Sequence, residues 1–357
     1  MEKIILEDTK QIFKSLNEEE IKKLENSTVL ITGFAGSLGF MLCQFFKNYS
    51  EQLKIKKVYC VDNFIFGKPR WINEFTNHKI FKIIEGNVVD INFSFAEEAD
   101  LIFHMASLAS PVYYRLHPIE TMDADVLGLR NLLDFYKDKQ IKGLLFYSTS
   151  EIYGDPSEDR VPTKETYWGN CNTSGPRACY DESKRFGETL CYNYSNVYGV
   201  PVRVIRPFNT YGPGLRDNDK RVVADFANNV LNNQDIVIFS DGKATRTFCY
   251  TTDSTVGAIK TILHNNYDIF NIGIEKREMT VRELAQIYKE IGEKYFGYTK
   301  DIIFKTHTDP HYLTDNPQRR CPDITKARSI LGYNPVVDVK VGVKRYLEYL
   351  HGLEESI

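Results

Sequence analysis

One short stretch, TVLITGFAGSLGF from Thr28 to Phe40, constrains the fold of this chain more than any other. An apolar run precedes glycines at Gly33, Gly36 and Gly39, and an apolar segment follows them. The pattern predicts a buried strand, a tight glycine turn and the start of a helix. Glycine permits a positive φ and close backbone approach, and a helix N-terminus presents free N–H groups to a diphosphate. A purely structural glycine turn is the alternative, because the spacing is GxxGxxG.

The next apolar run, residues 57–61, ends at Asp62. An acidic residue at this distance from the glycines can accept hydrogen bonds from an adenosine ribose, which favours NAD over NADP. Two alternatives remain open at this point. Asp62 could be a turn residue before Asn63, and Arg70 could hold the 2′-phosphate of NADP.

Short apolar runs alternate with helical patterns from residue 27 to about 150. This alternation predicts an α/β protein with a doubly wound parallel sheet, whose ligands lie at the C-terminal ends of the strands. We expect strands at 28–32, 57–61, 80–84, 100–104 and 143–148, and helices at about 38–49, 70–76, 93–98 and 118–138.

Two of these strand ends carry residues suited to a binding site. Ala106 and Ser107 follow the strand at 100–104, and their small side chains let a cofactor lie close to the backbone. Thr149, Ser150 and Glu151 follow the strand at 143–148. Their hydroxyls and carboxylate either cap the next turn or face the site, and we favour the site.

A long helix expected at about 179–198 contains Tyr180 and Lys184. Positions i and i+4 share a helix face, so the phenol and the ammonium can meet. A nearby ammonium lowers the pKa of a tyrosine, which makes a phenolate base accessible for a hydroxyl that loses its proton. A surface Tyr/Lys pair without function is the alternative.

The chain after residue 200 is mixed, and it contains arginines in turn-rich segments. We expect a strand at 202–206, helices at 221–232, 253–264, 280–296 and 324–331, and a short strand at 235–239. Arginine suits bidentate phosphate binding, although each of these side chains could also be a solvated surface residue. The arginines are Arg246, Arg319 and Arg320.

Composition excludes several classes of function. The net charge of −3 and the lack of a long basic run argue against nucleic acid as a partner. Seven scattered cysteines indicate reduced thiols in the cytoplasm, and we predict no metal site. No segment is apolar enough for a membrane span or a signal peptide.

Residues 1–26 show roughly helical apolar spacing, so we expect one or two amphipathic helices packed on the body or on a partner subunit, or else a frayed tail.

Taken together, TGxxGxxG, Asp62, Thr149-Ser-Glu151 and Tyr180-x-x-x-Lys184 resemble the extended short-chain dehydrogenase/reductase family of nucleotide-sugar epimerases and dehydratases. Within it, the run from Ser148 to Lys184 is most similar to the UDP-glucuronate decarboxylases. The resemblance implies a Rossmann-like fold with a smaller mixed α/β substrate lobe. The implied division is an extension at 1–26, a cofactor domain at 27–205 with a return segment at about 245–270, and a substrate lobe at 206–244 and 271–357.

The resemblance also implies a reaction. NAD would accept a hydride from C4 of a hexuronic acid while Tyr180 accepts the hydroxyl proton. Lys184 would hold the nicotinamide ribose and lower the pKa of Tyr180, and Thr149 would hydrogen-bond the C4 oxygen. The resulting 4-ketone is β to the carboxylate, so CO₂ can leave into an enolate. Glu151 and Ser150 would act near C5.

Further contacts come from the resemblance alone. One arginine of the pair at 319–320 would serve the sugar carboxylate or deliver a proton. The implied cofactor contacts are Gly33, Gly36, Ser37, Leu38, Gly39, Asp62, Asn63, Asn87, Val88, Ala106, Ser107, Tyr180 and Lys184. The implied substrate contacts are Asn209, Arg221, Arg246, Arg319, Arg320 and Asp323.

Several alternatives stay open. The related 4,6-dehydratases carry Asp where this chain has Ser150, which favours decarboxylation over dehydration, and the 4-epimerases lack Glu151. Departures from the family in the loops, such as Leu108, leave the nucleobase and the sugar open, with a UDP-sugar favoured. The remaining alternatives are a 4,6-dehydratase, a C4 dehydrogenase or epimerase, and a non-catalytic NAD-binding protein.

A homodimer is expected through helices 118–138 and 179–198, whose apolar residues could equally be core: Leu127, Leu129, Leu132, Leu133, Phe186 and Leu190.

Overall fold

Seven parallel strands form the central sheet of the computed structural model, which describes residues 1–216, 219–309 and 314–354. Their order is β11-β6-β5-β4-β1-β2-β3, so the winding direction reverses between β1 and β4. All five residues of β1 are buried, as expected in a parallel sheet covered on both faces. The predicted α/β, doubly wound class is confirmed. The strands are β1 (Thr28–Thr32), β2 (Lys57–Asp62), β3 (Phe81–Glu85), β4 (Leu101–His104), β5 (Gly143–Tyr147), β6 (Val202–Pro207) and β11 (Ile269–Ile272).

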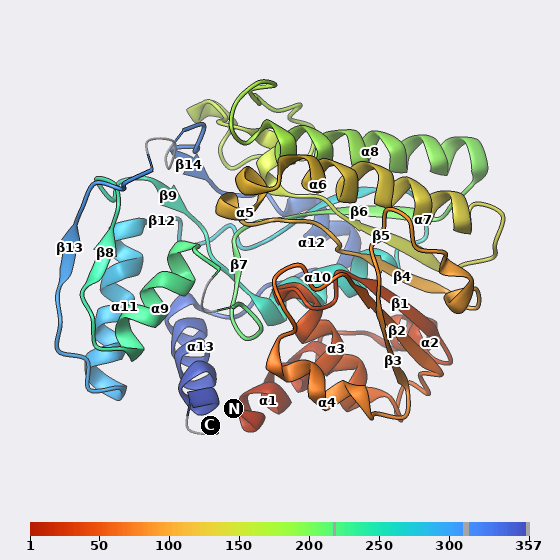
Figure 1. Ribbon diagram of the computed structural model, residues 1–357, viewed down its shortest axis with the longest axis horizontal. Coiled ribbons are helices and arrows are strands. Elements are labelled where there is room, and N and C mark those ends of the chain that lie inside the picture. The colour runs from red at the N-terminus through yellow and green to blue at the C-terminus, as the bar shows by residue number, and fades with distance from the viewer. Residues whose placement is uncertain (217–218, 310–313, 355–357) are drawn as a thin grey trace.

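Helices cover both faces of this sheet (Figure 1). On one face, α3 (Ser37–Tyr49) and α10 (Thr251–Ile262) join the largest apolar cluster, together with α1 (Glu2–Lys14). On the other face, α7 (Leu129–Tyr136) and α8 (Ala178–Tyr198) contribute to a second cluster. The left-handed Gly199 ends α8, a position for which glycine is suited because it lacks a Cβ. The sheet and the helices on its two faces therefore form three layers.

The helix expected over residues 118–138 is not continuous. It consists of α6 (Pro118–Met122), the π-helix η3 (Asp123–Gly128) and α7. π-Helical segments are rare, and those that do occur are often found at functional sites. This one carries the fully buried Asp125. The helices expected at 70–76 and 93–98 are short pieces as well: η1 (Arg70–Ile72), α4 (Asn73–Thr76) and η2 (Phe93–Ala96).

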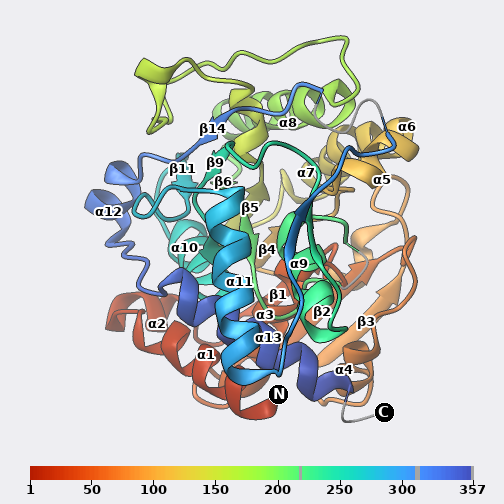
Figure 2. The ribbon, with the colours of Figure 1, turned by 90° about the vertical axis from the view of Figure 1, so that its left-hand side faces the viewer.

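A second lobe is built from the later part of the chain (Figure 2). Here α9 (Val222–Leu231) packs against α11 (Val281–Tyr295) and α13 (Val339–Glu354). A three-stranded sheet, β12-β9-β14, pairs Arg320 with Arg246. The other elements are α5 (Pro111–Leu116), η4 (Ser150–Tyr153), η5 (Glu158–Arg160), α12 (Thr325–Leu331), β7 (Thr210–Tyr211), β8 (Ile236–Ile238), β9 (Thr245–Arg246), β10 (Cys249–Tyr250), β12 (Met279–Thr280), β13 (Ile302–Phe304) and β14 (Arg319–Arg320).

The N-terminal segment forms α1 and α2 (Glu18–Leu24), which lie against the body rather than extending as a tail. Ile12 and Leu24 are fully buried, and α1 packs on α3 and α10. The Asn17 side chain and Glu20 cap α2 reciprocally. Glu20 also accepts two hydrogen bonds from Lys260 of α10. Within the described ranges, no helix is both long and apolar enough to cross a membrane.

Candidate active site

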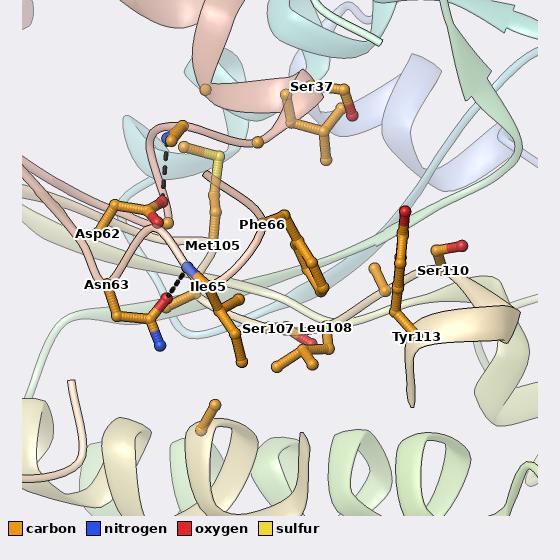
Figure 3. A pocket seen from close by; sticks show the side chains of 18 of the residues that line it. Ser37, Asp62, Asn63, Ile65, Phe66, Met105, Ser107, Leu108, Ser110 and Tyr113 are labelled. Atoms are coloured by element: carbon orange, nitrogen blue, oxygen red, sulfur yellow. Dashed lines mark hydrogen bonds between the residues drawn. The ribbon is translucent and has the colours of Figure 1, made fainter. Parts of the chain in front are cut away.

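The glycine loop between β1 and α3 forms one wall of a cavity (Figure 3). Gly33 has φ +70°, and a Cβ there would lie 2.6 Å from the backbone of Ala106. A Cβ on Gly39 would lie 2.1 Å from the carbonyl oxygen of Phe34. Both glycines are therefore required by the packing of the protein itself. A Cβ on Gly36 would meet only the Gly33 oxygen, at 3.3 Å, so Gly36 leaves open space for a ligand.

The loop and helix ends also fit an anionic ligand. Gly36 is the N-cap of α3, and no side chain caps the first N–H groups of this helix. These N–H groups and the positive end of the helix dipole suit a diphosphate. The residues present therefore fit a dinucleotide cofactor.

Asp62 lies at the end of β2 beside this loop, as Figure 3 shows. Its carboxylate accepts hydrogen bonds from the N–H groups of Ala35, at 3.1 Å, and Phe64, at 2.8 Å. Burial raises its pKa above the ordinary value, against those two hydrogen bonds and the charge of Arg216. A carboxylate held in this orientation can accept hydrogen bonds from a ribose. Arg70 is not among the described residues lining the cavity, so the structure does not place it for a 2′-phosphate.

Most of the cofactor contacts implied by the sequence line this one cavity. It brings together the loop residues, Asp62 and Asn63, the small residues after β4, and two residues after β3. They are Gly33, Gly36, Ser37, Leu38, Gly39, Asp62, Asn63, Asn87, Val88, Ala106 and Ser107. Tyr180 instead lines an adjoining cavity of about 550 Å³, which shares Ser37, Leu38 and Arg221 with the first.

Tyr180 and Thr149 meet in the wall of this larger cavity. Thr149 follows β5 and Tyr180 lies in the first turn of α8, which packs beside that strand end. Burial raises the pKa of the Tyr180 phenol, and a hydrogen bond with the Thr149 side chain acts in the opposite direction. Ser150 and Glu151 follow Thr149 and line the same cavity. Four residues predicted as catalytic therefore line the same cavity: Thr149, Ser150, Glu151 and Tyr180.

Lys184 lies near Tyr180, with its ammonium 5.8 Å from the centroid of the phenol ring, but its ion pair and its hydrogen bond are made elsewhere. Its ammonium lies 2.9 Å from Asp125 Oδ1 and donates a hydrogen bond of 2.9 Å to the carbonyl of Tyr147. Burial raises the pKa of Tyr180 well above its ordinary range, and the charge of Asp125 raises it further. The expectation that Lys184 lowers this pKa stays a prediction; in the structure the carboxylate of Asp125 pairs with the lysine charge and raises the pKa of Tyr180.

Glu151 is held by two arginines. Arg177 and Arg320 both donate to its carboxylate, the latter through two nitrogens. Burial raises the pKa of Glu151, but the charges of Arg177 and Arg320 outweigh this effect and hold the pKa at about 2. Glu151 is therefore a carboxylate at neutral pH.

The other implied substrate residues divide into two groups. Asn209, Arg221 and Arg246 line the larger cavity, Arg221 paired with Asp219 through a bond of 2.9 Å. Burial and the charge of Arg320 lower the pKa of Arg246 to about 9.

Arg319 and Asp323 are not among the described residues that line either cavity. Arg319 makes a two-nitrogen ion pair with Glu278, at 2.9 and 2.7 Å. The Asp323 carboxylate accepts a hydrogen bond of 2.8 Å from the N–H of Thr325, at the start of α12. The structure thus directs Arg320, and not Arg319, to the cavity.

Three residues of this site were missed from the sequence. Asp125, Tyr114 and Arg177 all contact the side chains just described: Tyr114 stacks on Tyr180 with ring centroids 5.1 Å apart. A signal for Arg177 was available, because it lies three residues before Tyr180 and thus on the same helix face. Asp125 and Tyr114 come from distant segments, and their local sequence carries no such signal.

Comparisons with known proteins identify the family. Residues 29–273 match the NAD dependent epimerase/dehydratase family. UDP-glucuronic acid decarboxylase 1 of Xenopus tropicalis is 36% identical over 336 residues, which cover 94% of this chain and 74% of that protein. UDP-glucuronic acid decarboxylase 1 of Arabidopsis thaliana is 37% identical over 318 residues, covering 89% and 68%.

Among solved structures, UDP-glucose 4-epimerase of Thermotoga maritima with UDP-glucose superposes with a TM-score of 0.79 at 26% identity. The superposition covers 92% of this chain and 99% of the epimerase. The predicted family and the NAD cofactor are confirmed by these matches. The chain belongs to the NAD-dependent epimerase/dehydratase family.

Proposed function

We propose that this protein is a nucleotide-sugar decarboxylase that oxidises C4 of UDP-glucuronate and releases its carboxylate as CO₂. One observation carries the proposal: the Tyr180–Thr149 pair and the arginine-bound Glu151 share one cavity, which adjoins the cavity of the glycine loop. The similarity to decarboxylases along most of the chain supports the same reaction.

In the proposed reaction, bound NAD supplies a hydride acceptor and later a hydride donor. Thr149 orients the C4 hydroxyl and Tyr180 takes its proton, so Tyr180 acts as the general base. Lys184 holds the ribose next to the nicotinamide. After oxidation the 4-ketone is β to the carboxylate, and loss of CO₂ leaves an enolate whose oxygen accepts hydrogen bonds from Thr149 and Tyr180. Glu151, Ser150 and Arg320 act at C5, where the enolate takes up a proton after CO₂ has left.

The other substrate contacts follow from their place in the cavity. We assign Asn209 and Arg246 to the diphosphate, because both line the cavity wall of the second lobe. Arg221 lies where the two cavities adjoin. Asp323, by contrast, is not among the described residues that line either cavity, although its carboxylate could accept further hydrogen bonds besides that from the N–H of Thr325.

Mass spectrometry of UDP-glucuronate incubated with the purified protein and NAD tests the function. We expect a product lighter by the mass of CO₂, and its final mass reports whether C4 is reduced again or the 4-ketone is released. Loss of water would indicate a 4,6-dehydratase. An unchanged mass with altered chromatographic mobility would indicate a 4-epimerase, and stoichiometric NADH without CO₂ loss would indicate a C4 dehydrogenase. Each of these three results would contradict the proposal.

We also propose a homodimer through α6, η3 and α8, which run side by side at one side of the molecule (Figure 1). Ile119, Leu127 and Phe186 are exposed on them, with 59%, 47% and 49% of their surface accessible. Leu129, Leu132 and Leu133, also named for this interface, are fully buried core residues instead.

Light scattering after size exclusion tests the dimer. We expect the wild type to elute with the mass of two chains, and the double variant Leu127→Glu/Phe186→Glu to elute as one chain. Val341→Glu on α13 is the matched control, since this side chain is also exposed but lies on another helix. A monomeric wild type would contradict the dimer.

We propose a cytoplasmic location. All seven cysteines are free thiols, including Cys43 and Cys60, whose sulfur atoms lie 4.0 Å apart and share a hydrogen bond rather than a disulfide. Free thiols in this number are typical of a reducing compartment. Fractionation of the source cells should recover the protein with cytosolic enzymes, and recovery with a membrane or secreted fraction would contradict the proposal.

A further inference from the structure

A buried ion pair between β6 and α8 takes no part in the proposed reaction as described so far. Arg206 of β6 donates hydrogen bonds to both carboxylate oxygens of Glu188 on α8, at 2.8 and 2.6 Å. Only 6% of Arg206 and 8% of Glu188 is exposed. Burial lowers the pKa of Arg206, but its hydrogen bonds to Glu188 outweigh this effect and hold the pKa above its ordinary value. The two side chains therefore form one fixed, two-pronged unit.

This ion pair holds both ends of the segment 148–153, which includes the three predicted catalytic residues that follow β5. At the first end, the Ser148 hydroxyl donates a hydrogen bond of 2.6 Å to Glu188 Oε1. At the other end, Arg206 Nη1 donates a hydrogen bond of 2.7 Å to the Tyr153 hydroxyl. One ion pair thus fixes both ends of the segment at once.

Tyr153 carries the same network on to the edge of the sheet. Its hydroxyl donates a hydrogen bond of 2.7 Å to Asn271 Oδ1 of β11, and the Asn271 amide donates one of 2.8 Å to the carbonyl of Thr163. Tyr153, Glu188 and Arg206 are not among the described residues that line the two cavities. They can therefore influence a ligand there only through the segment that they hold.

Helix α8 aligns this segment with the phenol of Tyr180. Tyr180, Lys184 and Glu188 follow one another at intervals of four residues, so they share a face of the helix. Lys184 donates to the backbone carbonyl of the last residue of β5, and Glu188 binds the hydroxyl of the residue after it. Thr149 comes next in the chain. Proton transfer needs close contact between reacting groups, and a displacement of about 1 Å can cost roughly 100-fold in rate.

We infer that Glu188 and Arg206 are positioning residues for the proposed reaction. Their ion pair holds both ends of the segment 148–153 and thereby aligns Thr149 with Tyr180. The inference rests on the proposed function, because it names what aligns the groups of that reaction. A buried ion pair contributes little net stability, since the loss of water from two charges offsets their attraction. The pair acts through its geometry instead.

Hydrogen exchange of the purified protein tests how firmly the segment is held. Ser148→Ala removes the hydroxyl at one end and Tyr153→Phe removes that at the other, whereas loss of Glu188 would leave the charge of Arg206 buried and unpaired. We expect amide exchange in peptides covering 148–153 to speed up by roughly 10-fold or more, with no change in the glycine loop. Unchanged exchange, or faster exchange throughout the protein, would overturn the inference.

Steady-state kinetics of the same two variants separate positioning from binding. We expect Ser148→Ala and Tyr153→Phe each to lower kcat by roughly 10- to 100-fold, the cost of a small misplacement of the reacting groups. KM and NAD affinity should stay within about 3-fold of the wild-type values, because the binding residues are unchanged. A kcat near that of the wild type, or a fall in kcat matched by equal losses of NAD and substrate affinity, would overturn the inference.

Tyr136→Phe is the matched control for Tyr153→Phe. Tyr136 is also fully buried, and its hydroxyl donates a hydrogen bond of 2.7 Å to the carbonyl of Ala96. It is not among the described residues that line either cavity. This variant loses the same kind of hydrogen bond, but its kcat should equal that of the wild type. Equal falls in kcat for Tyr136→Phe and Tyr153→Phe would assign both to a general loss of stability and overturn the inference.

Failure of the proposed function gives a different result. In that case the wild type would release no CO₂ from UDP-glucuronate, whereas the exchange experiment needs no substrate and still reports on the segment 148–153. Release of CO₂ by the wild type, together with wild-type exchange rates in both variants, would overturn the inference about the ion pair alone.

Discussion

Tyr180 is the single residue on which the proposed chemistry depends most. Tyr180→Phe removes only the hydroxyl, so we expect turnover to fall by about 10²–10⁴-fold, the contribution of a positioned general base. NAD affinity should persist, because the cavity of the glycine loop is built from other residues. Steady-state kinetics and a fluorescence titration with NAD measure the two effects.

Tyr194→Phe is the control for this change, because Tyr194 lies on the same helix but its hydroxyl donates a hydrogen bond of 2.8 Å to Asp134, away from both cavities. Its turnover should remain near that of the wild type. Turnover of Tyr180→Phe near the wild-type value would exclude Tyr180 as the base.

Asp125 controls the charge beside that base. Burial and then the charge of Asp125 raise the pKa of Tyr180. Asp125→Asn removes the negative charge, so the pKa of Tyr180 should fall and its base form should persist to lower pH. We expect the acidic limb of the kcat/KM profile to move down by about one pH unit.

Ser183→Ala is the matched control for Asp125→Asn. It removes the hydrogen bond of 2.9 Å that Ser183 donates to Asp125 Oδ2, but it leaves the charge in place. The pH profile of this variant should keep its wild-type midpoint. An acidic limb that stays fixed or moves upward in Asp125→Asn would contradict the assigned effect of the charge.

At the scale of elements, two glycines of the turn between β1 and α3 have different roles. We expect Gly36 to matter for ligand binding and Gly39 for folding. Gly36→Ala meets only one atom of the protein, at 3.3 Å, so we expect normal folding. Its methyl group would project into the cradle for the diphosphate, and NAD affinity should fall by about 10-fold or more. Gly39→Ala would place a carbon 2.1 Å from the Phe34 oxygen, so we expect it to lower the free energy of unfolding by at least about 2 kcal/mol.

Urea unfolding and NAD titration of the two variants distinguish these effects. The expected pattern is loss of affinity without loss of stability for Gly36→Ala, and loss of stability for Gly39→Ala. Unchanged NAD affinity in Gly36→Ala would show that the diphosphate does not lie against Gly36.

At the scale of the whole molecule, Asp8 ties the first helix to the last one. Its buried carboxylate accepts hydrogen bonds from Tyr250 of β10, at 2.7 Å, and from Arg345 of α13, at 2.8 Å. Burial raises its pKa to about 6, against the opposing effects of Tyr250 and Arg345. The folded state thus holds this proton more tightly than the unfolded chain, whose aspartates titrate near about 4. The contribution to stability is complete below pH ~4 and is lost as the pH rises through about 6.

Asp8→Asn removes this pH dependence. Between pH ~4 and pH ~7, the free energy of unfolding of Asp8→Asn should rise relative to that of the wild type by up to about 3 kcal/mol. Urea unfolding at the two pH values measures it, and Glu2→Gln, at an exposed position of the same helix, is the control. A difference that does not vary with pH, or that shifts in favour of the wild type, would contradict the raised pKa of Asp8.

Local sequence determined much of this molecule. The strands from β1 to β6 and the helices α3, α8 and α11 lie where apolar periodicity and glycine punctuation place them, because these signals act between near neighbours. The glycine loop and Asp62 also belong to one strand-turn-helix unit and its neighbouring strand. The cavity of the glycine loop could therefore be predicted from the sequence.

Tertiary structure alone decided the rest. α13 was not predicted, although its apolar residues recur with helical spacing, whereas the position of β11 at the sheet edge does not follow from a local pattern. The partner of Lys184 is Asp125 from another helix, and Arg177 and Arg320, far apart in the chain, meet on Glu151. Residue type and spacing are local, so the sequence by itself identified most of the candidate site residues. Only the tertiary structure decided which charges face one another, since pairing and burial depend on long-range contacts.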